Sequence, residues 1–386
     1  MDVPRSADFV VIGGGCIGTA VACYLARKRA GTVVLFEKDE LASGSTGRAA
    51  GLITLQWQDE FHLRLATEST SFFEMLSGEP RFGLRFRQPG YIHLYFTAAE
   101  ADRARRAQVL QKRFGVQVDL LTPAEVGRLL PGLNTQGVVL AANCARDGYT
   151  DPHLAVAAFA ELAKDEGARI FTGVEVTGID VADNRVTKVR TTAGEVSTGT
   201  VVDAAGPWAA VVSRQAGIDI PVRPFRRQLW FTSEIAAVPE DAPVLMDQHH
   251  DFYFRRESAG TLLCVGNPAE EISFRTDVDW SFAERVADYA IYRFPPFGEA
   301  RLASAWAAPR DITPDHDAIL GPLPELEGLY VAAGHSGHGF MLSPAVGRMM
   351  ADLIVDGRCD PDYSPLGFAR FAGRTYGPAD YRGTGV

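Results

Sequence analysis

A glycine-rich loop between two apolar runs constrains the fold of this chain more than any other feature. DFVVI at residues 8–12 is typical of a buried parallel strand, and GGGCIG follows directly at residues 13–18. Residues 19–31 have helical spacing up to a glycine stop, and TVVLFEK at residues 32–38 predicts a second strand. Strand, loop, helix, strand and a closing acid within about thirty residues form the unit that binds a dinucleotide.

Several residues of this unit have physical roles that follow from their positions. Gly13 permits the tight turn, Gly15 lets the backbone approach a pyrophosphate, and Gly18 lets the helix pack closely against the strand. The positive end of the helix faces the phosphates. Glu37 can accept hydrogen bonds from a ribose diol, and its charge repels the 2′-phosphate of an NADP-type ligand. We expect the bordering residues to contact the cofactor as well: Cys16, Ile17 and Lys38.

Composition limits the classes of function. With 386 residues, of which 46% are hydrophobic, the chain can bury a large core, and its length predicts two domains. A net charge of −10 argues against general attraction to nucleic acid or an anionic membrane, so we expect a small-molecule ligand. The five cysteines lack CxxC spacing, which argues against a disulfide framework and a zinc site. The start of the chain shows no secretory pattern and glycines interrupt the apolar residues 9–26, so we predict no membrane span and a cytoplasmic location.

Four further segments carry a family resemblance. They are LASGSTGRAAGLI at residues 41–53, GVEVTGI at 173–179, the hairpin-like residues 188–209 and the long segment 305–354. Together with the glycine loop, and in this order, they resemble the D-amino-acid oxidase superfamily of FAD enzymes. Within it they are similar to the branch of sarcosine oxidase, dimethylglycine dehydrogenase, glycine oxidase and the proline dehydrogenase β-subunit. No second glycine fingerprint follows a strand, so one dinucleotide is expected.

The resemblance implies an α/β (α+β) fold with a Rossmann-type FAD-binding domain and an inserted antiparallel β-sheet substrate domain. The FAD-binding domain is expected to be discontinuous, over residues 1–80, 133–220 and 301–386. The substrate-binding domain is expected over residues 81–132 and 221–300. Strand-like runs such as GYIHLYF and RRQLWFT lie in these last two segments, as such a sheet requires.

Family likeness also implies cofactor contacts beyond the glycine loop. Ser45, Thr46 and Arg48 would flank the pyrophosphate and the approach to the flavin. The residues expected beneath the ring and around the nucleotide are Ala49, Ala50, Gly51, Val176, Ala205, Gly206 and Trp208. The covalent flavin links of the family look absent, because Ala308 stands where one branch has the attaching cysteine and Arg48 stands near the histidine position of the dimethylglycine dehydrogenases. We therefore expect non-covalent FAD.

The segment GHSGHGF at residues 334–340 raises the question of a metal site, because it holds two histidines in HxxH spacing. Flanking glycines and the lack of a nearby cysteine argue against a metal. In the family this loop meets the pyrimidine end of the flavin, where backbone N–H groups and the following helix N-terminus would stabilise negative charge. The residues assigned to this contact are Gly334, His335, Gly337, His338, Gly339, Phe340 and Met341.

Three residues are candidates for contact with the substrate. Arg310 falls where glycine oxidase and D-amino-acid oxidase carry an arginine that grips the substrate carboxylate, a task that suits a planar guanidinium. Its alternative is a surface arginine beside Asp311. Tyr253 occupies the place of an active-site tyrosine in monomeric sarcosine oxidase, although an aromatic residue in a half-buried strand is usually part of the core. His338 would face the substrate or serve the structure alone.

The sequence departs from monomeric sarcosine oxidase at three positions. Cys264 stands in place of an oxygen-activating lysine, Pro268 in place of a histidine, and Met341 in place of a carboxylate-binding lysine. The exact substrate and the electron acceptor, oxygen or another, are therefore open.

The function that these features imply is FAD-dependent oxidation of a small amine or amino acid of the sarcosine, glycine, proline or D-amino-acid type. A hydride would pass from the C–H bond beside nitrogen to flavin N5, and the resulting imine would hydrolyse. Such chemistry needs positioning and desolvation more than a strong base. Two alternatives stay open: oxidation of a 2-hydroxyacid on the same fold, and a flavin-bearing β-subunit or assembly factor of a larger complex. Oligomers with copies of itself or with other chains are open as well.

Overall fold

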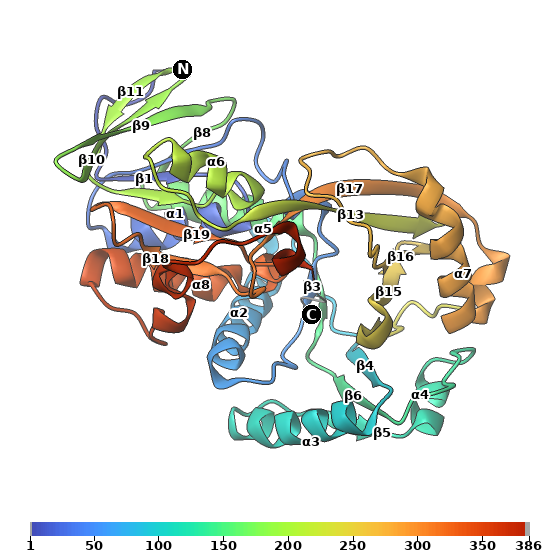
Figure 1. The fold of residues 1–386 in the computed structure, drawn as a ribbon. Coiled ribbons are helices and arrows are strands. Elements are labelled where there is room, and N and C mark those ends of the chain that lie inside the picture. Colours follow the sequence, from blue (N-terminus) through green and yellow to red (C-terminus); the bar gives the residue numbers. More distant parts are fainter. Residues whose placement is uncertain (1, 383–386) are drawn as a thin grey trace.

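Two sheets dominate the structure, a computed structural model that describes residues 2–382 (Figure 1). The first has six strands in the order β18, β19, β12, β1, β2 and β8, of which all but β18 run parallel to their neighbours. In that order the strands span Ile319–Pro322, Leu329–Ala333, Val201–Asp203, Phe9–Ile12, Val33–Phe36 and Arg169–Phe171. This sheet contains the predicted strand, loop, helix and strand unit.

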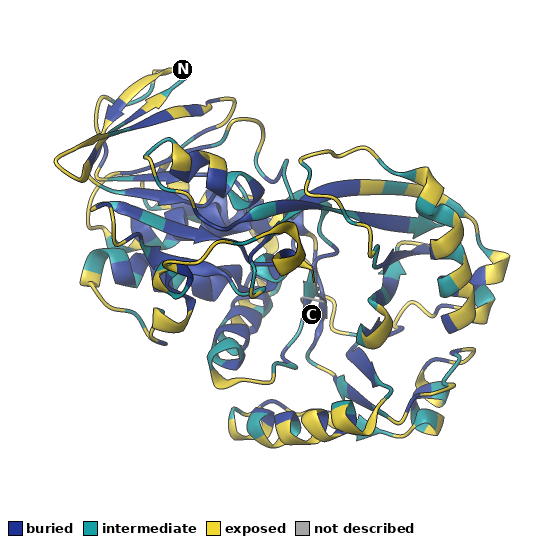
Figure 2. Ribbon diagram, viewed as in Figure 1, coloured by how far each residue is buried: buried dark blue, intermediate teal, exposed yellow. Residues whose placement is uncertain are grey.

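Alternation along β1 explains the layers around this sheet. Val10 and Ile12 pack on one face against the small sheet of β9 (Val176–Ala182), β10 (Arg185–Thr191) and β11 (Gly194–Ser197). Val11 packs on the opposite face, where helices cover the sheet. Because both faces are buried, the strands read as continuous apolar runs rather than alternating ones. Figure 2 shows these strands in dark blue between their covering layers.

The second sheet has eight strands and is antiparallel except for one neighbouring pair, β14 and β4. Its strand order is β17, β13, β16, β15, β14, β4, β6 and β5. In that order the strands span Leu302–Ile312, Arg223–Thr232, Gly260–Val265, Phe252–Glu257, Val244–Asp247, Tyr91–Tyr95, Leu140–Cys144 and Asp119–Leu121. A short ladder joins β3 (Leu52–Ile53) to β7 (Gly148–Tyr149) between the two large sheets. The predicted α/β (α+β) fold, with a parallel sheet and a largely antiparallel second sheet, is confirmed.

The two faces of the eight-stranded sheet have different tasks. In β4, Ile92 and Leu94 pack into the hydrophobic core beneath α7 and α4. Tyr91, His93 and Tyr95 point to the opposite face, because side chains alternate along a strand. That second face closes one side of the cavity described below.

Eight α-helices complete the described part of the chain, residues 2–382. They are α1 Cys16–Lys28, α2 Glu60–Gly78, α3 Ala98–Arg113, α4 Pro123–Leu129, α5 Pro152–Asp165, α6 Ala209–Arg214, α7 Ala283–Arg293 and α8 Gly339–Asp356. Helices α1, α5 and α8 pack on one face of the six-stranded sheet, and α2 packs against α8. None of the helices in this described region is long and apolar enough to cross a membrane.

The division into domains stays a proposal. Sheet membership bears on two of its boundaries, because β6 and β17 fall in segments assigned to the FAD-binding domain (133–220 and 301–386) yet pair within the eight-stranded sheet. Strand β17 runs alongside β13 over almost its whole length. It then leads into β18 of the six-stranded sheet, so the chain crosses between the sheets at this point.

Candidate functional site

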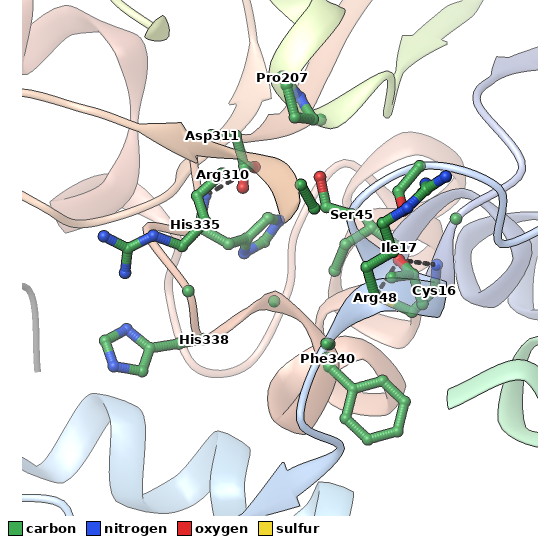
Figure 3. A pocket seen from close by; sticks show the side chains of 18 of the residues that line it. Cys16, Ile17, Ser45, Arg48, Pro207, Arg310, Asp311, His335, His338 and Phe340 are labelled. Atoms are coloured by element: carbon green, nitrogen blue, oxygen red, sulfur yellow. Dashed lines mark hydrogen bonds between the residues drawn. The ribbon is translucent and has the colours of Figure 1, made fainter. Parts of the chain in front are cut away.

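A cavity of about 580 Å³ lies between the carboxyl ends of the parallel strands and the open face of the eight-stranded sheet. Open α/β sheets bind ligands at this end of their strands. All the residues that the sequence analysis assigned to cofactor or substrate line this cavity, except Gly18 and Gly334. Figure 3 shows part of the lining, with Ile17, Ser45 and Arg48 on one side and Arg310 and His338 on the other.

The glycine loop has the geometry that the motif predicts. Gly13 has a φ of +115°, and a Cβ there would lie 2.5 Å from the backbone oxygen of Ala204. A Cβ on Gly18 would lie 1.9 Å from the backbone oxygen of Gly13. Gly18 therefore serves the close packing of α1 against the strand from outside the cavity, whereas Gly13 and Gly15 line it.

Hydrogen bonds within the protein hold the side chain of Glu37 in place at the end of β2. Its carboxylate accepts hydrogen bonds from the backbone N–H of Gly14 at 2.7 Å and from that of Asp39 at 2.9 Å. Both carboxylate oxygens also have lone pairs left for a ribose diol. The side chain lines the cavity beside Lys38.

The segment after β2 is tied to the start of α1 and to β17. The hydroxyl of Thr46 accepts a hydrogen bond from the backbone N–H of Cys16 at 3.2 Å. The hydroxyl of Ser45 donates to the backbone oxygen of Pro309, and the guanidinium of Arg48 donates to the backbone oxygen of Ser43. Arg48 thus braces its own loop, and its side chain still lines the cavity.

Aromatic stacking marks the other end of the cavity. Lys38 Nζ lies 4.0 Å from the ring centroid of Trp208, and Trp208 stacks on Phe274 with centroids 5.3 Å apart. Ala205 and Gly206 form the turn before Trp208, and Val176 lies at the start of β9. All five sequence-assigned residues of this end, including Lys38, line one cavity.

Asp311 organises the loop at residues 334–340 in a way that the sequence did not indicate. Its carboxylate accepts the backbone N–H of Gly334 at 2.7 Å and that of His335 at 3.0 Å. These two N–H groups are therefore already paired, and Gly334 is not among the lining residues, so its contact with the flavin stays a prediction. The free N–H groups lie one turn later, in the first turn of α8 at Gly339, Phe340 and Met341, because helix starts lack intrahelical acceptors.

Burial dominates the environment of both histidines of the HxxH segment. Burial lowers the pKa of the His335 imidazole, and its Nε2 has no hydrogen-bond partner among residues 2–382. Burial, with the nearby charge of His62, lowers the pKa of His338 to about 3, so this ring is neutral at pH 7. His338 meets Trp57 edge to face, with centroids 5.0 Å apart. In the described part of the chain no group of three or more His, Cys, Asp and Glu side chains is placed to hold a metal ion.

Arg310 lies against this loop and not on the open surface. Its side chain is 22% exposed, and its Nη2 lies 3.3 Å from Oε2 of Glu270. Its Nη1 would be 3.5 Å from a Cβ on Gly337. The Nε of Arg310 is buried and has no hydrogen-bond partner within residues 2–382. Arg310 lines the cavity, and its guanidinium makes one hydrogen bond among residues 2–382, to Glu270, so donors other than the buried Nε are left for a ligand there.

Tyr253 faces the cavity from β15, opposite Cys264 of β16. Burial raises the pKa of the Tyr253 phenol, which keeps it protonated and able to donate a hydrogen bond. The Cys264 thiol lies 3.6 Å from Nη1 of Arg227, so a guanidinium stands beside the position where the family likeness expects a lysine.

The sequence analysis assigned no contact to two further groups of lining residues. One group follows β3 and the other lies on or near the strands of the eight-stranded sheet. They are Gln56, Trp57, Gln58, Asp59, Tyr91, His93, Tyr95, Arg227, Leu229, Met246, Gln248 and Asp251. The available signal was alternation in GYIHLYF, which places a histidine among apolar neighbours on the face that carries two tyrosines.

The pH dependence of stability that His93 causes tests whether the cavity face of the eight-stranded sheet is buried. Burial lowers the pKa of His93 from 6.5 to about 4. As the pH falls from about 6.5 to 4, the unfolded chain takes up a proton that the folded protein refuses, so stability is lost in this window. We expect His93→Gln to reduce the loss in free energy of unfolding between pH 7.5 and pH 5 by on the order of 2 kcal/mol. Urea unfolding at the two pH values measures this loss.

The matched control is His153→Gln, which changes an exposed histidine and leaves His93 in place. That variant should keep the wild-type difference between the two pH values. An equal pH dependence in His93→Gln and the wild type would mean that the ring is hydrated in solution and that this face of the sheet is open.

The cavity fits the FAD that the sequence resemblance implies. Gly13 and Gly15 leave room for a close approach of backbone to pyrophosphate, and Glu37 is preset for a ribose. Two helix N-termini, those of α1 and α8, open into the same cavity and favour negative charge. A cradle that no side chain of residues 2–382 fills thus runs from Trp208 to the loop beside Arg310.

Comparisons with known proteins agree with this geometry. A family model described as FAD dependent oxidoreductase matches residues 8–353. Sarcosine dehydrogenase of Homo sapiens is 30% identical over 96% of this chain, which spans 42% of that protein. The crystal structure of L-proline dehydrogenase from P. horikoshii superposes with a TM-score of 0.89 at 32% identity and covers 96% of this chain and 98% of its own. Glycine oxidase from Geobacillus kaustophilus gives a TM-score of 0.83 at 27% identity over 97% of this chain and all of its own.

Proposed function

The chain belongs to the family of FAD-dependent oxidoreductases, and from this premise we propose that it oxidises a small amine or amino acid at the C–H bond beside nitrogen. Oxidation of amines and amino acids is typical of this family. The chain spans less than half the length of the sarcosine dehydrogenases and dimethylglycine dehydrogenases it matches, so activity and substrate are proposals for this chain.

One observation carries the proposal. Arg310, with unpaired donors, lies beside the loop at residues 334–340, and both share a cavity with the dinucleotide elements around Gly15 and Glu37. A guanidinium at one end and a nucleotide cradle at the other define where a small carboxylate-bearing molecule and a flavin would meet.

Arg310 would bind the substrate carboxylate through its planar fork and so fix the orientation of the adjacent carbon. Tyr253, protonated because it is buried, would donate a hydrogen bond and limit the width of the pocket. His338 is neutral at pH 7 and therefore adds no charge that would repel a cationic amine. Closing these groups around the substrate excludes water and holds the reacting C–H bond in place.

Bound FAD would supply the acceptor for the hydride of that C–H bond, which carries both electrons of the oxidation. The substrate loses this hydride and a proton from nitrogen and becomes an imine. Water then hydrolyses the imine to a carbonyl compound and an amine. The N–H groups of Gly339, Phe340 and Met341, at the start of α8, stabilise negative charge by about 0.3 to 2 kcal/mol per helix terminus.

We propose a substrate of the sarcosine, glycine, L-proline or D-amino-acid type. The relatives named sarcosine dehydrogenase, L-proline dehydrogenase and glycine oxidase support this range. The predicted cytoplasmic location stays a proposal, as do oligomers with copies of itself or with partner chains.

Matched pairs of substrates test the chemistry. Purified protein is mixed with glycine or glycolate, and with D-alanine or D-lactate, together with a dye that accepts electrons. We expect dye reduction with the amine of a pair and none with the hydroxyacid. Reduction by hydroxyacids alone would replace the proposal with 2-hydroxyacid oxidation. A repeat in air without dye shows whether oxygen accepts the electrons.

We also propose that FAD is bound without a covalent link. Ala308 and Arg48, which the family likeness matches to attachment positions of other branches, both line the cavity, and neither side chain is a nucleophile suited to a covalent link. Acid precipitation of the protein should therefore leave all of the FAD in the supernatant. Yellow colour that stays with the precipitated chain would contradict this prediction.

A further inference from the structure

Glu270 lies between the guanidinium groups of two arginines. Its Oε1 is 2.6 Å from Nε of Arg227, and its Oε2 is 3.3 Å from Nη2 of Arg310. Its side chain is only 11% exposed, so the pairing is largely shielded from water. Both arginines line the cavity. Neither the glycine motif nor the loop at residues 334–340 indicated a role for Glu270.

The charges of this group are balanced before a substrate arrives. Arg227 also pairs with Asp251, whose Oδ2 lies 3.0 Å from its Nη1. Two guanidinium groups therefore face two carboxylates. A ligand that brings a carboxylate alone makes the group net negative, whereas a zwitterionic amino acid adds no net charge. In a site shielded from water such a difference has a large effect on affinity.

Glu270 lies closer to Arg227 than to Arg310, which indicates that its contact with Arg310 is the one that can open. Arg227 has two carboxylate partners: Glu270 at 2.6 Å, in an ion pair without hydrogen-bond geometry, and Asp251 at 3.0 Å. Within residues 2–382 Arg310 has Glu270 as its one carboxylate partner, in a longer hydrogen bond of 3.3 Å. Glu270 itself lies in segment 266–279, which contains no helix or strand. A side chain on such a segment can shift at smaller cost than one on a central strand.

We infer that Glu270 is a specificity-determining residue that competes with the carboxylate of the substrate for Arg310. This inference rests on the proposed function, in which Arg310 binds that carboxylate. In the free protein Glu270 accepts a hydrogen bond from Nη2 of Arg310. An amino acid displaces the carboxylate of Glu270 toward Arg227. The ammonium group of the amino acid then compensates the negative charge that its own carboxylate adds. An anion without a cationic group has to displace Glu270 without this compensation and binds weakly.

Calorimetric titration of the purified flavoprotein tests the inference with three probes of similar shape: propionate, propylamine and propionamide. Glu270→Gln removes the competing charge and keeps the shape of the side chain. We expect propionate to bind about tenfold more tightly to the variant and propylamine to bind more weakly. Propionamide, which is neutral, should keep its affinity. A residue with only a structural role would not strengthen the binding of an anion when it is changed.

The neighbouring residue provides the matched control. Glu271 is exposed, and its contact with Arg226 involves only its backbone oxygen. Glu271→Gln removes the same charge one residue away and should leave propionate binding unchanged. In the double variant Glu270→Gln with Arg310→Gln the tighter binding of propionate should vanish, because the guanidinium that binds propionate is gone. If Glu270→Gln does not fold, Glu270→Ala carries the same expectations.

Unchanged or weaker propionate binding in a folded Glu270→Gln variant would overturn the inference, as would equal tightening in Glu271→Gln. These titrations need no turnover, so their outcome is separate from that of the proposed function. Oxidation of an amine without the tightening rejects only the role of Glu270. The tightening without oxidation of any amine rejects the proposed reaction and leaves Glu270 as a gate for anions.

Discussion

Replacing Arg310 by glutamine is expected to lower kcat/KM for a carboxylate-bearing amine by roughly 30- to 3,000-fold. The change removes charge-assisted hydrogen bonds to the carboxylate in a shielded site, and such a loss costs about 2 to 5 kcal/mol, with tenfold for each 1.4 kcal/mol. The FAD content should stay the same, because Arg310 lies at the loop end of the cavity and not at the nucleotide cradle. Steady-state kinetics with the best substrate of the panel measures the effect.

Two controls separate the role of Arg310 from a general effect of lost charge. Arg301→Gln changes an exposed arginine just before β17, which touches Ser233 only through its backbone, and should leave the kinetics unchanged. Arg310→Lys keeps the charge but lacks the planar fork, so its kcat/KM should fall between those of the wild type and Arg310→Gln. An equal loss for an amine that lacks a carboxylate would show that Arg310 does not bind the carboxylate.

The second large effect is expected at Gly13, where alanine should abolish stable FAD binding. The new Cβ would lie 2.5 Å from a backbone oxygen, and backbone cannot move aside as a flexible side chain can. Strain in the left-handed region and overpacking together cost about 2 to 5 kcal/mol, enough to reduce bound FAD to less than about a tenth of the wild-type content. The ratio of flavin to protein absorbance after purification measures this content.

Gly83→Ala is the matched control for this change. Gly83 also has a positive φ, of +62°, but a Cβ there would meet no atom within 4 Å. It therefore carries the backbone strain without the collision and without proximity to the cavity. Gly83→Ala should retain FAD in full. Full FAD content in Gly13→Ala would contradict the role of the loop as the cradle for pyrophosphate.

Local spacing explains why the dinucleotide unit was predictable. The loop from Gly13 to Gly18 and the acid at Glu37 belong to one short unit, in which each residue is positioned by its near neighbours. The helix at α8 and most residues of the loop before it were predictable through the family resemblance, and the structure brings them to the same cavity. In these places local sequence and tertiary structure agree.

Long-range pairing explains what the sequence did not reveal. Trp57 and Gln248 follow different strands and reach the cavity only because β3 and β14 lie beside it in the folded chain. Asp311 was treated as a neighbour of Arg310, yet its carboxylate holds the N–H groups of Gly334 and His335. Spacing alone shows which charges a chain contains, whereas pairing across more than twenty residues depends on the fold.

The central claim is that this cavity holds FAD and delivers electrons from an amine to it. The most direct test is the visible absorption spectrum of the purified protein without oxygen, before and after addition of sarcosine, glycine, L-proline and a D-amino acid in turn. We expect a flavin spectrum that one of these compounds bleaches. If none of them changes the flavin spectrum, the protein either oxidises another substrate or is a subunit that needs a partner chain. Absence of flavin, even after reconstitution with FAD, would contradict the claim itself.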